Sequence, residues 1–163
     1  MDCGVFVHNC FTFKKIPLIS FSITHSGDWI DQEAAKVCGI NVSAITRYKE
    51  TKLNLDKIDP SNMKDASLDI FYQNMIEHAL DLFAEKFNQL ENPIDVPLEI
   101  VVAGGTSMVP GFLNKFNVIL KGKSLPFKVK GVRAAENPLY AVAKGCLIKA
   151  MSIESKKKKE EGK

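Results

Sequence analysis

The sequence predicts an α/β domain, because strand-like and helix-like segments alternate along its 163 residues. An apolar run over residues 98–103 stops at Gly104, and a helical pattern resumes over residues 112–120. A second stretch, residues 64–91, carries a broad apolar stripe at helical spacing, which is typical of a helix buried along much of its length.

The first part of the chain predicts two strands and a helix. Residues 4–13 are rich in β-forming side chains, and residues 16–24 combine alternating and apolar character. Residues 26–28 predict a turn in which Asp28 caps the next helix, and an apolar stripe over residues 29–37 supplies that helix.

Two helices are predicted in the middle of the chain. Residues 43–54 form a short polar helix, and the long helix over residues 64–91 is capped by Asp65 or Ser67. His78 lies beside the apolar stripe of the long helix. We interpret it as a boundary residue and not a ligand, because the sequence shows no second ligand near it.

The last part predicts two strands, a helix and a tail. Leu98–Val102 is predicted to be a central buried strand, since it is apolar without alternation. Residues 125–130 predict a short edge-like strand, and Pro138 suits the first turn of a final helix. Residues 153–163 are rich in Lys and Glu and predict a disordered, solvated tail; contact of its lysines with anionic lipid or nucleic acid is the alternative.

Composition narrows the classes of function. The net charge of +3 owes much to the tail, and Arg47 and Arg133 are the only arginines, so no nucleic-acid partner is expected. No apolar stretch reaches about 18 residues and no signal peptide is evident, which predicts a cytoplasmic protein with no integral membrane segment. The four cysteines lack metal-site spacing, and the three histidines are dispersed, so neither a zinc site nor a nucleophilic triad is predicted.

The glycine turn after residue 103 is the strongest candidate for a binding site. Glycine lets the backbone approach a ligand closely, and the turn follows the carboxyl end of a strand, where open α/β sheets bind ligands. Physical reasoning alone leaves a second interpretation open, namely a tight strand-to-helix connection without a ligand.

Gly104, Gly105, Thr106 and Ser107, followed by a Pro-Gly pair, resemble the adenosine motif of the actin, DnaK-type chaperone and sugar kinase superfamily. The resemblance implies that these residues pack under the adenine and ribose of ATP or ADP. It also implies a cleft between two halves of a protein, of which this chain carries the second.

The start of the chain resembles the second phosphate motif of the same family, usually Asp-x-Gly-x-Gly-Thr. Asp2 and Gly4 match it, which implies that Asp2 acts on Mg²⁺ or its waters and that the Gly4 amide holds phosphate. Residues 5–7, Val-Phe-Val, stand where small or hydroxylic residues are expected and would obstruct approach of the backbone to a phosphate. A plain first strand remains the alternative.

A third resemblance involves the segment after the first hairpin. Gly27, Asp28 and Asp31 resemble the family's Gly-Gly-Asp-x-Phe-Asp segment, which begins a helical insert, here about residues 28–92. In relatives the next helix carries a Glu and a Lys at the edge of the adenine and ribose. Lys49 matches the lysine, whereas the acidic position is occupied by Thr46, with Glu50 as a substitute. A solvated charged helix face is the alternative for this run.

These resemblances identify residues 1–152 as the carboxyl half of an actin-like ATPase, nearest to the MreB and DnaK-related kind, with an RNase H-like mixed sheet and a helical insert. The first phosphate loop and the carboxylate that orients the hydrolytic water are absent from these residues, so the chain is predicted to be degenerate and inactive alone, with no catalytic residue. Expected partners are an amino-terminal half or homologous subunits, in a homo-oligomer or filament.

Two other classes of function remain open. One is a non-catalytic interaction or filament-contact module that retains the fold, and the other, less favoured, is a kinase of small metabolites. Cell shape and cytoskeleton, plasmid segregation, chaperoning and enzyme reactivation all use this superfold, so the fold does not select among these roles.

Overall fold

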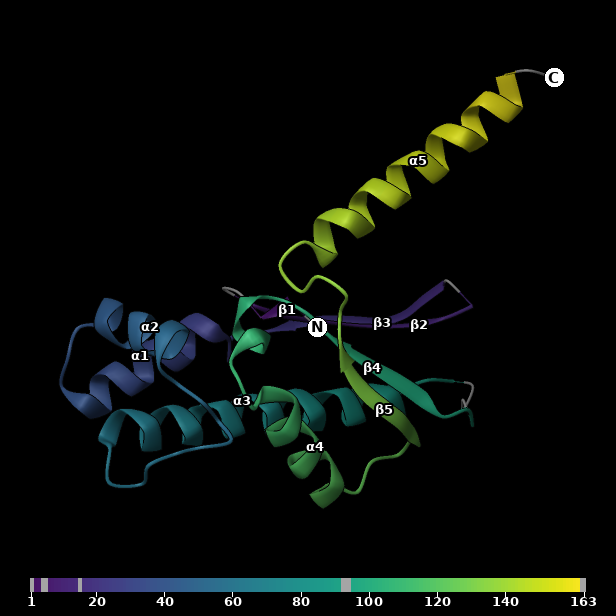
Figure 1. The fold of residues 1–163 in the computed structure, drawn as a ribbon. Coiled ribbons are helices and arrows are strands. Elements are labelled where there is room, and N and C mark those ends of the chain that lie inside the picture. Colours follow the sequence, from purple (N-terminus) through teal and green to yellow (C-terminus); the bar gives the residue numbers. More distant parts are fainter. Residues whose placement is uncertain (1, 4–5, 15, 92–94, 162–163) are drawn as a thin grey trace.

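The computed structural model describes residues 2–3, 6–14, 16–91 and 95–161, which form an α/β arrangement (Figure 1). The elements, in chain order, are β1 (Asp2–Cys3), β2 (Val7–Phe13), β3 (Ile16–Ile23), α1 (Gly27–Cys38), α2 (Val42–Thr51), α3 (Met63–Asn88), β4 (Leu98–Val102), the 3-10 helix η1 (Gly105–Met108), α4 (Phe112–Gly122), β5 (Val129–Ala134) and α5 (Ala141–Glu161). The three helices α1 to α3 thus fall in the segment that was expected to form a helical insert.

The strands form two sheets instead of the single mixed sheet expected from the sequence. Strands β1, β2 and β3 make an antiparallel sheet, and β4 pairs with β5 in a separate parallel sheet. The expectation that Leu98–Val102 is a fully buried central strand is wrong for the described residues, because Glu99 is exposed and pairs with Arg133 of β5 at 3.1 Å. Only the two ends of β4, Leu98 and Val102, are buried.

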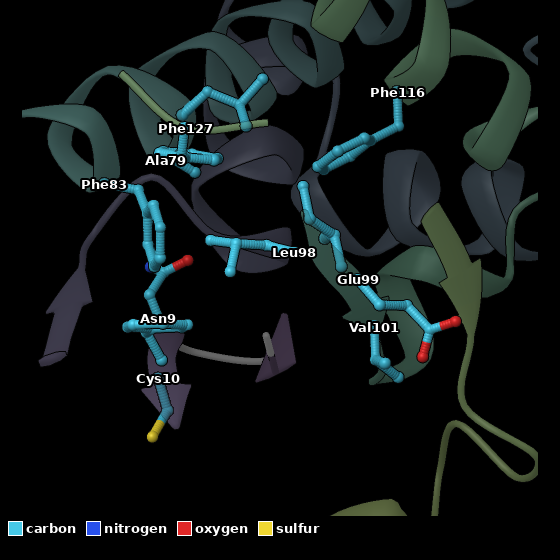
Figure 2. Close-up of a pocket in the computed structure, with 12 residues that line it drawn as sticks. Asn9, Cys10, Ala79, Phe83, Leu98, Glu99, Val101, Phe116 and Phe127 are labelled. Atoms are coloured by element: carbon cyan, nitrogen blue, oxygen red, sulfur yellow. The ribbon is translucent and has the colours of Figure 1, made fainter. Parts of the chain in front are cut away.

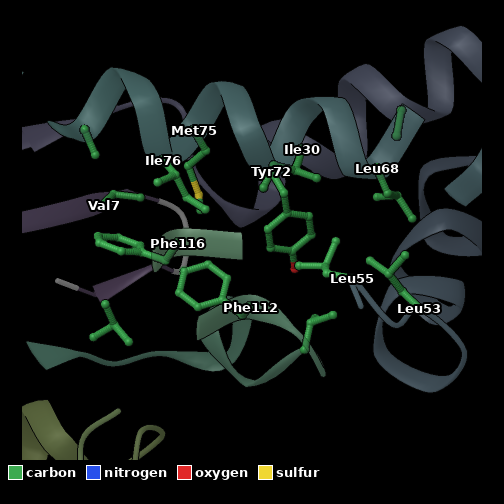
Figure 3. Close-up of a cluster of buried hydrophobic side chains, with 14 of the residues drawn as sticks. Val7, Ile30, Leu53, Leu55, Leu68, Tyr72, Met75, Ile76, Phe112 and Phe116 are labelled. Carbon is green, nitrogen blue, oxygen red and sulfur yellow. The ribbon is translucent and has the colours of Figure 1, made fainter. Parts of the chain in front are cut away.

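Helix α3 contributes side chains to both hydrophobic cores. Its buried face carries Tyr72, Met75 and Ile76, which pack with Phe112 and Phe116 of α4 in the main hydrophobic core (Figure 3). A second, smaller core lies toward the far end of the hairpin and collects aromatic and aliphatic side chains from β2, β3, α3, β4 and the segment before β5: Phe11, Ile19, Phe87, Leu98 and Phe127. The long helix therefore contributes to both cores, and burial along much of its length agrees with the prediction from its broad apolar stripe.

The helix caps differ from those expected. Ser26, not Asp28, caps α1, because its side chain accepts from the backbone N–H of Trp29 at 3.4 Å. Asn62 caps α3 in place of Asp65 or Ser67. The Asp65 carboxylate is engaged elsewhere, since it accepts from the Tyr48 hydroxyl at 2.8 Å. Two good N-cap residues therefore stand two positions before Asp28 and three positions before Asp65, the acidic residues on which the prediction relied.

The carboxyl end departs most from expectation. Helix α5 continues through Glu161, although residues 153–163 were predicted to be disordered. Lys and Glu are good helix formers, and adding them to an existing helix avoids the cost of nucleation. The helix points away from the rest of the chain (Figure 1), and a Cβ at Gly145 would meet no atom within 4 Å, so this glycine serves no close packing. Strand β5 lies over residues 129–134, later than the predicted 125–130.

Candidate functional site

The turn after β4 is shaped by Gly104. This residue has φ 92° and ψ 158°, a conformation that favours glycine. Its carbonyl accepts from both the backbone N–H and the hydroxyl of Ser107, at 3.1 and 2.8 Å, and its own N–H donates to the Pro138 carbonyl at 2.9 Å. Gly104 and Ser107 therefore hold the turn together from within.

The same loop is clamped to the helices at two further points. The Tyr72 hydroxyl, on the buried face of α3, donates to the Thr106 carbonyl at 3.2 Å. The Leu55 N–H donates to the Pro110 carbonyl at 2.8 Å, and Gly111 follows with φ 85°. A Cβ on Gly111 would lie 2.8 Å from the carbonyl carbon of Leu55, so only glycine fits where the loop meets the α2–α3 connection.

A cavity of about 420 Å³ lies between this loop and the helices α1 and α2. Its wall combines polar side chains of the two helices with the backbone and apolar side chains of the loop: Asp28, Asp31, Thr46, Lys49, Glu50, Gly105, Thr106, Met108, Val109 and Pro110. The structure thus brings Lys49 to the same cavity as Gly105 and Thr106. Gly104 and Ser107 are buried behind the lining.

Lys49 is already paired inside this wall. Its ammonium lies 2.8 Å from Asp31 Oδ1 and donates to the Gly27 carbonyl at 3.2 Å. Both charged side chains are less than a tenth exposed, at 8% for Lys49 and 4% for Asp31. Thr46, which stands where relatives place an acidic residue, donates its hydroxyl to Asp31 Oδ2 at 2.8 Å. Asp31 is therefore the centre of the network, a role that the sequence analysis did not assign to it.

The spacing of polar residues within α1 and α2 indicates part of this network. Asp28 and Asp31 lie three positions apart on α1, and Thr46 lies three and four positions before Lys49 and Glu50 on α2. Residues at such spacing share one helix face. What the spacing could not show is that these two faces meet, because that depends on how α1 packs on α2.

The charged side chains of the cavity wall determine which ligand groups can bind there. Asp28, Asp31 and Glu50 supply three carboxylates against the single ammonium of Lys49. An anion placed here would be repelled, whereas hydroxyl or amino groups would find acceptors. Met108, Val109 and Pro110 form an apolar side on which a flat ring could rest.

The predicted phosphate site is described only in part. Gly4 lies outside the described residues, and of Asp2 only the backbone, in β1, is described. Strand β1 contacts η1, so the strand that carries Asp2 lies against the glycine loop. Val7 is fully buried in the main core, and Phe6 is 46% exposed. The Val7 position is thus used for packing and not for an open, ligand-facing backbone.

The structure also brings together two histidines that the sequence analysis treated separately. The ring of His25, which precedes α1, lies 4.3 Å from the ring centroids of both His78 and Trp29. Burial lowers the pKa of His25, and the nearby His78 lowers it further. The two histidines stand far apart in sequence, so no local pattern could predict that they meet.

The part of the chain that the structure describes contains neither a metal-binding group of side chains nor a membrane-spanning helix. Within residues 2–3, 6–14, 16–91 and 95–161, no three His, Cys, Asp or Glu side chains gather closely enough to hold a metal ion. Over the same ranges, no helix has the length and apolar character needed to cross a membrane.

The arrangement belongs to the actin-like class of α/β folds at the level of overall architecture. It is similar to the crystal structure of ethanolamine utilization protein EutJ from Carboxydothermus hydrogenoformans, with a TM-score of 0.56 and 18% sequence identity. The similarity covers 85% of this chain and 43% of that chain, so the 163 residues span less than half of the EutJ structure.

The family assignment is more specific. Residues 7–150 match the Volactin family, and the chain belongs to that family. No curated protein matches the chain.

Proposed function

We propose that this chain is the nucleotide-binding carboxyl half of an actin-like ATPase and that it holds the adenosine part of ATP or ADP in the cavity between α1, α2 and the glycine loop. One observation carries the proposal. Lys49 of α2 lies in the wall of the same cavity as Gly105 and Thr106, although more than fifty residues separate them. The nucleotide-binding type of fold, which the similarity to EutJ supports, is consistent with this position.

The wall suggests how a nucleoside would lie. The adenine ring rests on the apolar side formed by Met108, Val109 and Pro110, and the carboxylates accept hydrogen bonds from the ribose hydroxyls. Gly105 is exposed and leaves the base free to approach the loop backbone. Since the carboxylates repel anions, the phosphates must leave the cavity, and β1 lies next to η1 to receive them.

Asp2 and Gly4 are the proposed phosphate and Mg²⁺ contacts at that end. Protein-bound Mg²⁺ commonly uses one or two carboxylates together with substrate phosphates, so a single Asp2 carboxylate fits an ion that arrives with the nucleotide. When bound, the ion neutralises phosphate charge. The chain's own contribution is to orient the nucleoside through α1, α2 and the loop.

We expect no appreciable ATP hydrolysis by this chain alone. Hydrolysis needs preorganised groups on both sides of the transferred phosphate. The similarity covers 43% of the EutJ chain. Under the proposal, this chain supplies one side of such a cleft. A steady-state phosphate-release assay with Mg²⁺ and saturating ATP should stay far below about 1 per second. Turnover at or above that rate would show that the half-domain interpretation is wrong or that an oligomer completes the site.

Calorimetry of ADP with the wild-type protein and with Gly105→Val tests the proposal. A Cβ at position 105 would meet only Leu139 Cδ2, at 3.8 Å, so the variant should fold while its methyl groups crowd the ligand. Gly145→Val on α5 is the matched control, because its Cβ would meet no atom within 4 Å. Binding that is lost in Gly105→Val and kept in Gly145→Val supports the site. Equal affinity of all three proteins removes the loop from it.

A second candidate function is a non-catalytic interaction module. Two observations favour it: Val7 packs in the core where an open phosphate turn is expected, and the carboxyl segment exposes a set of large apolar side chains. These are Leu139, Tyr140, Val142, Leu147, Ile148, Met151 and Ile153. Under this alternative the wild-type protein binds no adenine nucleotide at millimolar concentration, whereas Leu147→Ser combined with Met151→Ser abolishes self-association in sedimentation experiments.

A further inference from the structure

Two of the three histidines of the chain lie side by side in the structure. His25 lies in the turn between β3 and α1, and His78 lies on α3, more than fifty residues later. The centroids of the two rings are 4.3 Å apart, with 48° between the ring planes. The sequence shows no second ligand near His78, and the fold supplies one in His25.

The ring of His25 carries a nitrogen that nothing described satisfies. Its Nδ1 atom is buried and has no hydrogen-bond partner among the described residues. A buried polar atom without a partner costs free energy, so it requires an explanation. Contact with the Trp29 ring, 4.3 Å away between centroids, explains the packing of the imidazole but does not satisfy its nitrogen. The lone pair of an imidazole nitrogen is a common ligand of transition-metal ions.

The separation of the two rings suits a shared metal ion. Such an ion lies about 2.0–2.1 Å from an imidazole nitrogen and therefore about 3.2 Å from the centroid of the ring. Two rings that bind one ion thus have centroids no more than about 6 Å apart. The 4.3 Å between His25 and His78 lies within this limit and is short enough for the two nitrogens to take adjacent positions around the ion.

Both histidines are attached to well-held parts of the backbone. Ser26, which follows His25, caps α1, and its carbonyl accepts from the Ile30 N–H at 3.0 Å. His78 precedes the buried Ala79 on α3, and α1 packs against α3. Little conformational freedom is therefore lost when an ion binds. Both histidines are half-buried, so the pair lies near the surface, within reach of ions in solution.

We propose that His25 and His78 together bind one divalent transition-metal ion of the class that prefers imidazole, such as Zn²⁺, Ni²⁺ or Cu²⁺. No third His, Cys, Asp or Glu of the described residues joins the pair, so water completes the coordination. The ion ties the β3–α1 turn to α3. It stabilises the folded chain, because the unfolded chain does not hold the two ligands together.

The histidine pair is separate from the cavity of the proposed function. Neither histidine lines the cavity beside Lys49 and Gly105. A smaller cavity, of about 100 Å³, also lies elsewhere, since Figure 2 shows Asn9, Phe83 and Leu98 around it. Metal binding at the pair can therefore be tested without nucleotide.

The first test uses the wild-type protein and NMR of imidazole nitrogens. An equimolar addition of Zn²⁺ should shift the ring resonances of His25 and His78 together and leave those of His8 unchanged. His8 is a matched internal control, since it is exposed and its Nδ1 lies 2.6 Å from the Ser22 hydroxyl. Mg²⁺, which prefers oxygen ligands, should shift none of the three histidines.

The second test uses the fluorescence of Trp29, the only tryptophan of the chain. Its ring lies next to that of His25, so a Cu²⁺ ion bound to the pair should quench it. His25→Gln and His78→Gln should each weaken Cu²⁺ binding by more than about tenfold, because even the loss of an outer-shell partner of a metal ligand costs about 10–100-fold. His8→Gln should leave the affinity within about twofold of the wild-type value.

Two results would overturn the proposal. One is a Zn²⁺ titration that shifts neither His25 nor His78, or that shifts His8 alone. The other is an equal affinity for Cu²⁺ in the wild-type protein and all three variants. Circular dichroism of the metal-free variants checks that they fold, and the NMR result decides if one of them does not. Neither experiment contains nucleotide, so the proposal can fail while the proposed function stands.

Discussion

Helices α1, α2 and α3 pair buried polar groups with one another, whereas the described parts of the strands and of α5 expose strand edges that pair with no other described strand, and apolar side chains. On the helical side, Lys49 meets Asp31 at 2.8 Å and Tyr48 meets Asp65 at 2.8 Å. On the strand side, β4 pairs with one strand, β5, among the strands that the structure describes, and Leu147 of α5 is 60% exposed. The helical region holds its shape by its own contacts, and the strand region has surfaces suited to further polypeptide.

The proposed nucleotide site lies where the helical region meets the strand region. The nucleoside end lies against the complete helical region, and the phosphate end lies toward the short β1. We therefore expect binding through the nucleoside without turnover.

The largest loss of stability is expected when the buried Lys49 is replaced. Lys49→Met leaves the Asp31 carboxylate buried without its cation and should lower the free energy of unfolding by about 3–5 kcal/mol. Lys36→Met is the control, since its pair with Glu33 is largely exposed and contributes about 0–1 kcal/mol. Urea denaturation measures both. A Lys49→Met cost no larger than that of Lys36→Met would contradict a self-sufficient helical region.

The second largest loss of stability is expected where the glycine loop meets the α2–α3 connection. Gly111→Ala forces a Cβ against the Leu55–Asp56 backbone at φ 85° and should destabilise the protein by about 2–4 kcal/mol. Gly39→Ala has a similar positive φ, 63°, but open space, so it should cost only about 1–2 kcal/mol. Thermal melts of the two variants compare them, and equal costs would show that the clamp does not constrain the loop.

The histidine pair predicts a smaller, pH-dependent effect. Burial, aided by His78, lowers the pKa of His25 below its ordinary value of 6.5. The unfolded chain then binds a proton more readily than the folded chain, so stability is full above pH 6.5 and declines as pH falls through 6.5 toward the folded pKa. His25→Phe should remove part of this decline in melts at pH 7.5 and 5.5. An identical decline in both proteins would rule out a contribution from His25.

The smallest effect is expected on α5. Leu147→Ala removes a side chain that is 60% exposed and should change stability by no more than about 0.5 kcal/mol. Leu68→Ala on α3 removes the same atoms from a fully buried position and should cost about 2–5 kcal/mol. A large loss with Leu147→Ala would show that α5 packs against the body in solution.

Much of the helical region could be predicted from the sequence, because its signals are local. The apolar stripe over residues 64–91 located α3, and the glycine turn located the loop after β4. The meeting of Asp31 with Lys49 and of His25 with His78 could not be predicted, since it depends on packing between elements distant in sequence.

The strand region was predicted less well for a physical reason. An apolar run such as Leu98–Val102 indicates which side chains are buried. Pairing between strands forms through backbone hydrogen bonds, so the residue types do not reveal which strands are neighbours. The helix of residues 153–161 was missed because a charged composition was interpreted as disorder without regard to the helix that precedes it.

The most direct test of the central claim is a comparison of adenosine, ADP and ATP by calorimetry on the wild-type protein. If the cavity beside Lys49 and Gly105 supplies most of the binding, and the phosphates outside it gain little from Asp2 and Gly4, the three ligands should bind with affinities within about tenfold, a spread of about 1.4 kcal/mol. Binding of ATP that is more than about a hundredfold tighter than that of adenosine, or no binding of adenosine at all, would contradict the account.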